Sequence, residues 1–278
     1  MLRWRPAVTA AALGLLLAGC AADPMTSHIR AERLPAEGEN PNAPKAEVVV
    51  RVAAATAARG DAATAASLFR RAHALDSNNF AALLGLARML GRLGAYDEAA
   101  DAYRAALKLR PEDPEALRGL GNTLIVLNQA AAALQQFELA LKKSNDARLY
   151  NGLGVASDML DEYKVAQAYY RTGLDLAPDG TELANNLGLS LLLSGDLGEA
   201  VRVLRRVAGG MRATARHRLN LALALVLSGE SGAALEIVRM DLDPASADAQ
   251  IAWFETLRAI ASPKALREAI GTQLAGAV

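Results

Sequence analysis

The sequence repeats a pattern of small and bulky apolar residues every 34 residues, with a single interval of 33. An alanine recurs at Ala65, Ala99, Ala133, Ala166, Ala200 and Ala234. Four positions after each alanine comes a bulky apolar residue, at Phe69, Tyr103, Phe137, Tyr170, Leu204 and Val238. A fixed interval of this length is typical of stacked helix–turn–helix units, which bind through the surface that the stack creates. The periodicity therefore predicts an all-α array and favours a binding protein over an enzyme.

Further recurring residues indicate which kind of unit is stacked. A leucine or valine followed by a small residue precedes each recurring alanine, as in Leu86-Ala87, Leu120-Gly121 and Leu187-Gly188. The turn position holds glycine at Gly60, Gly94, Gly195 and Gly229, and Asn128 and Asp161 in the other two units. Glycine, and less readily Asn or Asp, tolerates the left-handed backbone of such a turn. This pattern resembles the tetratricopeptide repeat (TPR). The resemblance implies an all-α TPR α-α superhelix, a right-handed solenoid of antiparallel helix pairs.

The register places six repeats within residues 46–244, followed by a capping region. The repeats are predicted at residues 46–79, 80–113, 114–146, 147–180, 181–214 and 215–244. Residues 245–278 are predicted to form capping helices, at Ser246–Ile260 and Pro263–Ala275, because the end of a solenoid has to cover an exposed apolar face. We expect Trp253-Phe254 to pack on the sixth repeat, and the alternative is that this pair docks a partner.

The first 45 residues differ from the repeats in composition. Residues 1–19 combine Arg3 and Arg5 with an apolar stretch, as signal peptides do. They lead into Leu17-Ala18-Gly19-Cys20, which resembles a lipobox and implies a lipid on Cys20, the only cysteine of the chain. An ordinary secretory signal or a short membrane helix is the alternative. Residues 20–45 contain four prolines and little apolar surface, so we expect a lipidated, disordered tether.

The residue after the lipobox cysteine bears on localisation. Ala21 follows Cys20, where an aspartate would favour the inner membrane by the sorting rule of enteric lipoproteins. The resemblance therefore implies a lipid anchor in the outer membrane, on its periplasmic face. Asp23 lies two positions further on and leaves inner-membrane sorting open.

Composition argues against several classes of function. Lys+Arg and Asp+Glu both total 30, so the formal charge is zero and no basic stripe predicts nucleic-acid binding. His28, His73 and His217 lie far apart in the sequence and far from Cys20. No H-E-x-x-H, G-x-S-x-G or P-loop pattern occurs in the sequence. We expect no catalytic residue, no metal site, no cofactor and no small-molecule substrate.

The resemblance also implies where a protein partner binds. In TPR proteins, ligand-facing positions are the second, fifth, ninth, twelfth and thirteenth of each repeat. These positions predict a groove formed by Leu84, Arg88, Arg92, Arg118, Asn122, Arg148, Asn151, Asn185, Leu189, Leu192, Leu193, Leu219, Leu223, Val226 and Leu227. One half of this groove is basic and polar and the other is apolar, which suits a segment with an acidic end and an apolar end. The alternative is that Leu192 and Leu193 pack on the neighbouring helix.

A narrower resemblance rests on four segments. They are residues 84–88 (LGLAR), 150–156 (YNGLGVA), 185–190 (NNLGLS) and 216–224 (RHRLNLALA). Together with the lipobox and the repeat region, they resemble the TadD family of TPR lipoproteins from the tight-adherence (Flp) pilus machinery. This resemblance implies a pilotin-like assembly factor whose partner is an outer-membrane secretin or another pilus component. The alternative is a TPR lipoprotein scaffold for type IV pili, outer-membrane protein assembly or peptidoglycan enzymes.

Overall fold

The computed structural model describes residues 45–260, 265–266 and 268–269. These residues form helices joined by short turns, with no strand among them, which confirms the predicted all-α array. Thirteen helices follow one another along the chain: α1 (Ala46–Ala58), α2 (Ala62–Leu75), α3 (Phe80–Arg92), α4 (Tyr96–Leu109), α5 (Pro114–Val126), α6 (Ala130–Leu141), α7 (Ala147–Met159), α8 (Tyr163–Leu176), α9 (Thr181–Leu193), α10 (Leu197–Ala208), α11 (Ala215–Leu227), α12 (Ser231–Val238) and α13 (Pro244–Leu257).

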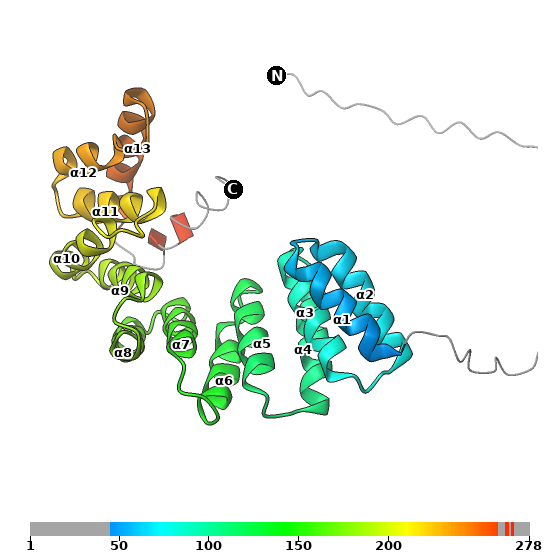
Figure 1. Cartoon of the computed structure of the whole chain (residues 1–278). Coiled ribbons are helices and arrows are strands. Elements are labelled where there is room, and N and C mark those ends of the chain that lie inside the picture. Colours follow the sequence, from blue (N-terminus) through cyan, green and yellow to red (C-terminus); the bar gives the residue numbers. More distant parts are fainter. Residues whose placement is uncertain (1–44, 261–264, 267, 270–278) are drawn as a thin grey trace, which may run out of the picture. The chain divides into compact units, whose positions relative to one another are not determined.

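The first twelve helices form six successive pairs (Figure 1). We call the first helix of each pair the A helix (α1, α3, α5, α7, α9, α11) and the second the B helix. Each A helix contacts its own B helix and the A helix of the next pair. Each B helix packs on the A helix that follows it in the chain. The A helices therefore lie side by side, and the surface that they present is called the A face below.

Side chains at the helix N-termini explain where several helices begin. The carboxylate of Asp61 accepts a hydrogen bond from the Thr64 N–H at 3.0 Å, and the Asn79 side chain accepts one from the Ala82 N–H at 3.0 Å. Asp113 does the same before α5, whose first residue is Pro114. The first N–H groups of a helix have no partner within the helix, and proline has no N–H to satisfy there. The local sequence thus fixes these starts.

The turn within each pair needs a left-handed residue. Gly60, Gly94, Gly195 and Gly229 have φ between 77° and 93°. Asn128 and Asp161 take the same role with φ of 57° and 62°, as the sequence predicts. The left-handed region is costly for most L-residues and least so for Asn and Asp.

The recurring bulky residue of each B helix fills the space between two A helices. A Cβ at Gly121 on α5 would lie 2.6 Å from the Phe137 ring, and a Cβ at Gly152 on α7 would lie 2.5 Å from the same ring. Tyr103 is held in the same way against Gly119, at 2.4 Å. The small residues therefore admit the aromatic rings, and the rings join each repeat to the next. The buried residues of this core run through the whole array.

The array ends in α13, which packs on α11 and α12. Phe254 is buried in the same apolar cluster as the sixth pair, and Trp253 is half-buried with its ring centroid 5.1 Å from that of Phe254. Residues 265–266 and 268–269 are helical, and Leu266 belongs to that cluster. The rest of the predicted helix Pro263–Ala275 lies outside the described residues. So do the predicted signal peptide, Cys20 and all but the last residue of the predicted tether.

Within the described part of the chain, no helix is both long and apolar enough to cross a bilayer.

Candidate functional site

The predicted groove residues divide into three groups by exposure. Four side chains on the A face are exposed, namely Arg88, Arg92, Asn122 and Arg148. Six are half-buried: Arg118, Asn151, Leu189, Leu193, Leu219 and Leu227. Five are buried and offer little surface to a ligand: Leu84, Asn185, Leu192, Leu223 and Val226. The structure therefore corrects part of the predicted apolar half: Leu192, Leu223 and Val226 are core residues, whereas its other four leucines are half-buried.

Arg88, Arg92 and Arg118 line a cavity of about 490 Å³ on the A face between α3 and α5, which we call the arginine cavity. Its lining residues are Arg88, Gly91, Arg92, Tyr96, Tyr103, Glu115, Arg118, Gly119, Asn122, Thr123 and Val126. Arg88 is bound to Glu115 at 2.7 Å. Arg92 and Arg118 have no ion-pair partner among the described residues, so the cavity carries an excess of positive charge.

A second, smaller cavity of about 300 Å³ adjoins the arginine cavity towards α7, and its two arginines are balanced by Glu115 and Asp146. It shares Glu115 and Arg118 with the arginine cavity and adds Arg148. The Nε of Arg148 donates to Asp146 at 2.8 Å, and this hydrogen bond is the main reason why the pKa of Asp146 lies below its usual value. Arg148 is thus partly neutralised, and Arg118 is the arginine common to both cavities.

A chain of amide side chains crosses the A face further along, over α7, α9 and α11. The Asn186 amide donates to Asn151 at 3.0 Å, and the Asn220 amide donates to Asn185 at 2.8 Å. Asn186 and Asn220 were not among the predicted groove residues. Their recurrence at an interval of 34 residues, like that of Asn151 and Asn185, is the signal in the sequence that could have found them.

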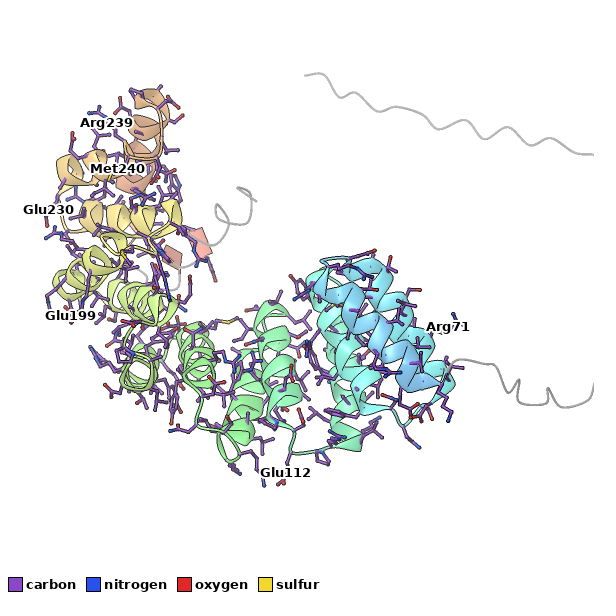
Figure 2. All side chains as sticks on the ribbon, viewed as in Figure 1. Arg71, Glu112, Glu199, Glu230, Arg239 and Met240 are labelled. Atoms are coloured by element: carbon purple, nitrogen blue, oxygen red, sulfur yellow. The ribbon has the colours of Figure 1, made fainter. Side chains whose placement is uncertain are left out.

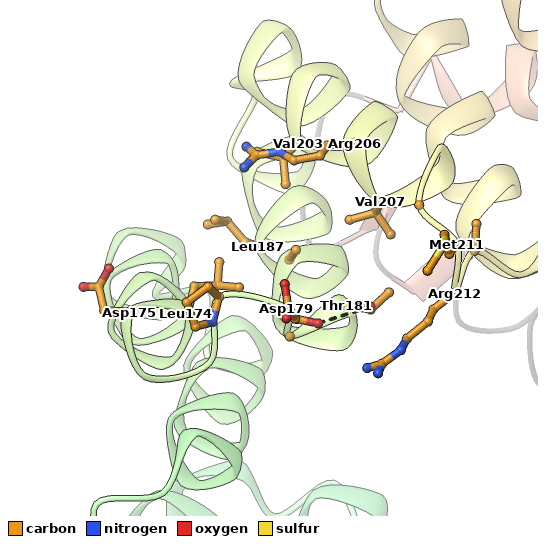
Figure 3. Close-up of a pocket in the computed structure, with 15 residues that line it drawn as sticks. Leu174, Asp175, Asp179, Thr181, Leu187, Val203, Arg206, Val207, Met211 and Arg212 are labelled. Atoms are coloured by element: carbon orange, nitrogen blue, oxygen red, sulfur yellow. Dashed lines mark hydrogen bonds between the residues drawn. The ribbon is translucent and has the colours of Figure 1, made fainter.

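A third cavity, of about 600 Å³, lies at the ends of α8, α9 and α10 and was not predicted (Figure 3). Leu174, Leu187, Val203 and Val207 give it apolar walls. Asp175, Asp179, Arg206 and Arg212 also line it, and the Thr181 hydroxyl donates to the Asp179 carbonyl at 3.5 Å. Ala184 lines it too, at the position in its repeat that Leu83 and Leu117 occupy in theirs. The smaller side chain of Ala184 accounts for part of the space.

The histidines do not gather into a site. His217 is buried at the start of α11, where its Nδ1 accepts a hydrogen bond from the Thr214 N–H at 3.2 Å and completes a capping box. His73 lies far away on α2. In the residues that the structure covers, no group of three or more His, Cys, Asp or Glu side chains could hold a metal ion.

A comparison with protein-family models identifies the repeat. The tetratricopeptide repeat model matches residues 53–114, 84–148 and 159–215, which together cover more than half of the chain. The chain belongs to the tetratricopeptide repeat family. Its A face is the surface that the A helices of these TPR units line.

Curated relatives match only part of this TPR protein. The human protein O-mannosyl-transferase TMTC1 is 33% identical over 97 residues, which are 33% of this chain and 11% of the relative. Cellulose synthase operon protein C of Pseudomonas fluorescens is 30% identical over 129 residues, 43% of this chain and 10% of the relative. The chain thus spans about a tenth of the length of these relatives.

Solved structures of low sequence identity have the same fold. PilW, a type IV pilus biogenesis factor, superimposes with a TM-score of 0.65 at 22% identity, covering 69% of this TPR protein and 90% of PilW. PilF of Pseudomonas aeruginosa superimposes with a TM-score of 0.61 at 19% identity, covering 74% and 97% of the two chains.

Proposed function

We propose that this TPR protein is a lipid-anchored scaffold on the periplasmic face of the outer membrane. In this role it binds a component of the tight-adherence pilus machinery, foremost the secretin, and promotes its assembly. The anchor is the lipid that the lipobox implies on Cys20, and the binding surface is the A face. The chain acts by binding, without a catalytic step of its own. The general role, that of a TPR scaffold for protein–protein interaction, follows from membership of the TPR family.

The observation that carries the binding role is the uncompensated basic surface of the A face. Arg92 and Arg118 line a cavity between α3 and α5 and lack an ion-pair partner among the residues described. A guanidinium group can bind a carboxylate with two parallel hydrogen bonds. A polypeptide with acidic side chains therefore complements this surface.

Two likenesses support pilus assembly as the process. The segments at residues 84–88, 150–156, 185–190 and 216–224 resemble TadD proteins. The structural neighbours include PilW, a type IV pilus biogenesis factor. A membrane anchor would hold several secretin subunits near one patch of membrane, and this raises their effective concentration for assembly.

The proposal is tested by recovering the partner from outer membranes under conditions that keep the lipid attached. The parent protein and the Cys20→Ala variant are expressed with the same affinity tag, and co-purified proteins are identified by mass spectrometry. The expected result is a secretin or another pilus component with the parent, and its loss with Cys20→Ala. Recovery of cell-wall enzymes or β-barrel assembly proteins alone would contradict the pilus assignment.

A second pair of variants tests the binding surface. Arg92→Glu combined with Arg118→Glu reverses the charge on the A face, and we expect at least a tenfold lower recovery of the partner. Arg71→Glu combined with Arg171→Glu is the matched control, because both arginines are exposed on B helices (α2 and α8; Figure 2 labels Arg71) and neither lines the arginine cavity. Equal losses from both variants would show a non-specific effect of net charge instead of a site on the A face.

A further inference from the structure

The fourth repeat contains an internal carboxylate, that of Asp158, and both of its oxygens accept hydrogen bonds from hydroxyl groups. On α8, the Tyr170 hydroxyl donates a hydrogen bond to Asp158 Oδ2 at 2.8 Å. The hydroxyl of Ser190, on α9 of the next repeat, donates to Asp158 Oδ1 at 2.6 Å. Both carboxylate oxygens of Asp158 are therefore held by hydroxyl groups, one from its own repeat and one from the next. Burial, foremost, and the neighbouring carboxylate raise the pKa of Tyr170 well above its ordinary value, so its hydroxyl keeps the proton that it donates.

The same positions occur two repeats earlier with the acid missing. Moving back 67 residues replaces Tyr170 with Tyr103, Ser190 with Thr123 and Asp158 with Gly91. Tyr103 and Thr123 keep the two hydroxyl groups, and both are buried, with 6% of each residue exposed. The Tyr103 hydroxyl has no hydrogen-bond partner among the described residues, and Thr123 donates to the Gly119 carbonyl at 2.9 Å instead. The aspartate position is held by a glycine whose Cβ would meet no atom within 4 Å.

The empty carboxylate position lies in the arginine cavity. Gly91, Tyr103, Gly119 and Thr123 all line that cavity. The Tyr103 hydroxyl reaches its wall, since it lies 2.6 Å from where a Cβ of Gly119 would stand. The hydroxyl oxygen itself is not buried, so it opens onto the cavity and can donate a hydrogen bond to a group that enters there.

The surroundings of Gly91 are more positively charged than those of Asp158, as a site that binds an acid from another molecule requires. Around the empty position stand Arg88, Arg92 and Arg118. The residues 67 positions further on, around Asp158, are Val155, Met159 and Asn185, which carry no charge. The site with its own carboxylate thus has no arginine at these positions, whereas the site without one has three, and only Arg88 is matched by an acid, Glu115.

We infer that the arginine cavity binds a side-chain carboxylate of a polypeptide partner, which takes the place that Asp158 occupies beside Tyr170. The Tyr103 hydroxyl donates to one carboxylate oxygen, and Arg118 and Arg92 supply the opposite charge. An internal Asp or Glu is the source, because the arginine cavity adjoins the smaller cavity beside α7, with which it shares Glu115 and Arg118, and so suits a chain that runs past it instead of ending in it. This inference deepens the proposed function, since it rests on the A face being the binding face of the scaffold.

Small probes test the carboxylate site without any partner. The purified chain, labelled with ¹⁵N, is titrated with N-acetyl-aspartate N-methylamide, which carries a side-chain carboxylate and no terminal one. The expected result is saturable shifts of the amide signals of Gly91, Gly119 and Thr123, with affinity in the millimolar range that weakens as salt is added. N-acetyl-asparagine N-methylamide is the neutral control and should leave these signals unchanged. Shifts from the asparagine probe, or from N-acetyl-alanine with its terminal carboxylate alone, would overturn the assignment.

Two substitutions test the position within the cavity. Gly91→Asp restores the internal acid, and we expect it to abolish probe binding, whereas the matched Gly91→Ala retains binding within about twofold. Tyr103→Phe should weaken binding at least fivefold, whereas Tyr170→Phe, which removes the equivalent hydroxyl beside Asp158, should leave binding unchanged. Probe binding by Gly91→Asp equal to that of the parent would overturn the proposal.

The probe titration and the membrane pull-down fail independently. Loss of the pilus partner would leave the probe result standing. If the parent binds no probe but the partner is recovered, the scaffold proposal is supported and the carboxylate site is contradicted.

Discussion

Tyr170 on α8 donates its hydroxyl hydrogen to the carboxylate of Asp158 on α7 at 2.8 Å. The tyrosine is buried and its ring lies against Gly154 of the same repeat. The residue therefore combines the packing role of the recurring bulky position with a polar link inside the fourth repeat.

Removing this hydroxyl should cost stability. We expect Tyr170→Phe to lower the free energy of unfolding by about 1–2 kcal/mol, because a hydrogen bond to a charged group is lost while Asp158 stays partly buried. Urea denaturation followed by circular dichroism measures the change. Tyr103→Phe is the matched control, since that hydroxyl has no hydrogen-bond partner among the described residues. We expect a change within about 0.5 kcal/mol for it. Equal losses in the two variants would contradict the role of the Asp158 hydrogen bond.

The raised pKa of Tyr170 predicts sensitivity to alkaline pH. Because the folded state raises this pKa, the folded protein prefers the protonated tyrosine more strongly than the unfolded chain does. The associated stabilisation is fully present below the unfolded pKa of about 10 and is lost as pH rises above it. Thermal unfolding between pH 8 and pH 11 should show a steeper loss for the parent than for Tyr170→Phe. Parallel curves would mean that Tyr170 does not contribute to the pH dependence.

Two glycines should respond to the same substitution in opposite directions. A Cβ at Gly121 would lie 2.6 Å from the Phe137 ring, which is fully buried and cannot move aside freely. Gly121→Ala should therefore destabilise by about 1–3 kcal/mol. Gly91 has open space around its Cβ position, and alanine is the better helix former, so Gly91→Ala should stabilise by up to about 1 kcal/mol. Urea unfolding measures both, and a gain in stability for Gly121→Ala would refute the close approach of α5 to Phe137.

The ion pair between Arg218 and Asp241 should make the C-terminal end of the array sensitive to acid. Arg218 Nε donates to Asp241 at 2.6 Å, linking α11 to the turn before α13. This hydrogen bond, foremost, lowers the pKa of Asp241. The stabilisation is present above the unfolded pKa of about 3.9 and disappears as pH falls through the lower folded value.

Comparison of the parent with Asp241→Asn tests this pH dependence. The parent should be more stable at pH 7, and the difference should close on acidification as Asp241 becomes protonated. Asp248→Asn is the control, because Asp248 is exposed and its nearest contact to Arg239 is 3.5 Å. A difference for Asp241→Asn that persists at the lowest pH would count against the ion pair.

Much of the fold could be predicted from the sequence alone. The interval of 34 residues, the turn residues such as Gly94 and Asn128, and the N-terminal Asp113-Pro114 are local signals. Each of these signals acts on residues close to it in the sequence, by setting the backbone φ, capping a helix or defining the helix period. Each also recurs in several of the six repeats. That is why helix positions and the all-α class follow from the chain without knowledge of its contacts.

Which side chains of the A face are exposed was decided only by the tertiary structure. The register places Leu192, Leu223 and Val226 at ligand-facing positions, but the neighbouring A helices approach closely enough to bury them. Spacing along a helix sets the direction of a side chain, whereas its exposure depends on how near the next helix lies, and distant residues fix that distance. For the same reason, the sequence placed Arg92 and Arg118 on the binding face, and only the packed helices showed that the Tyr103 hydroxyl, without a hydrogen-bond partner among the described residues, opens onto the cavity that they line.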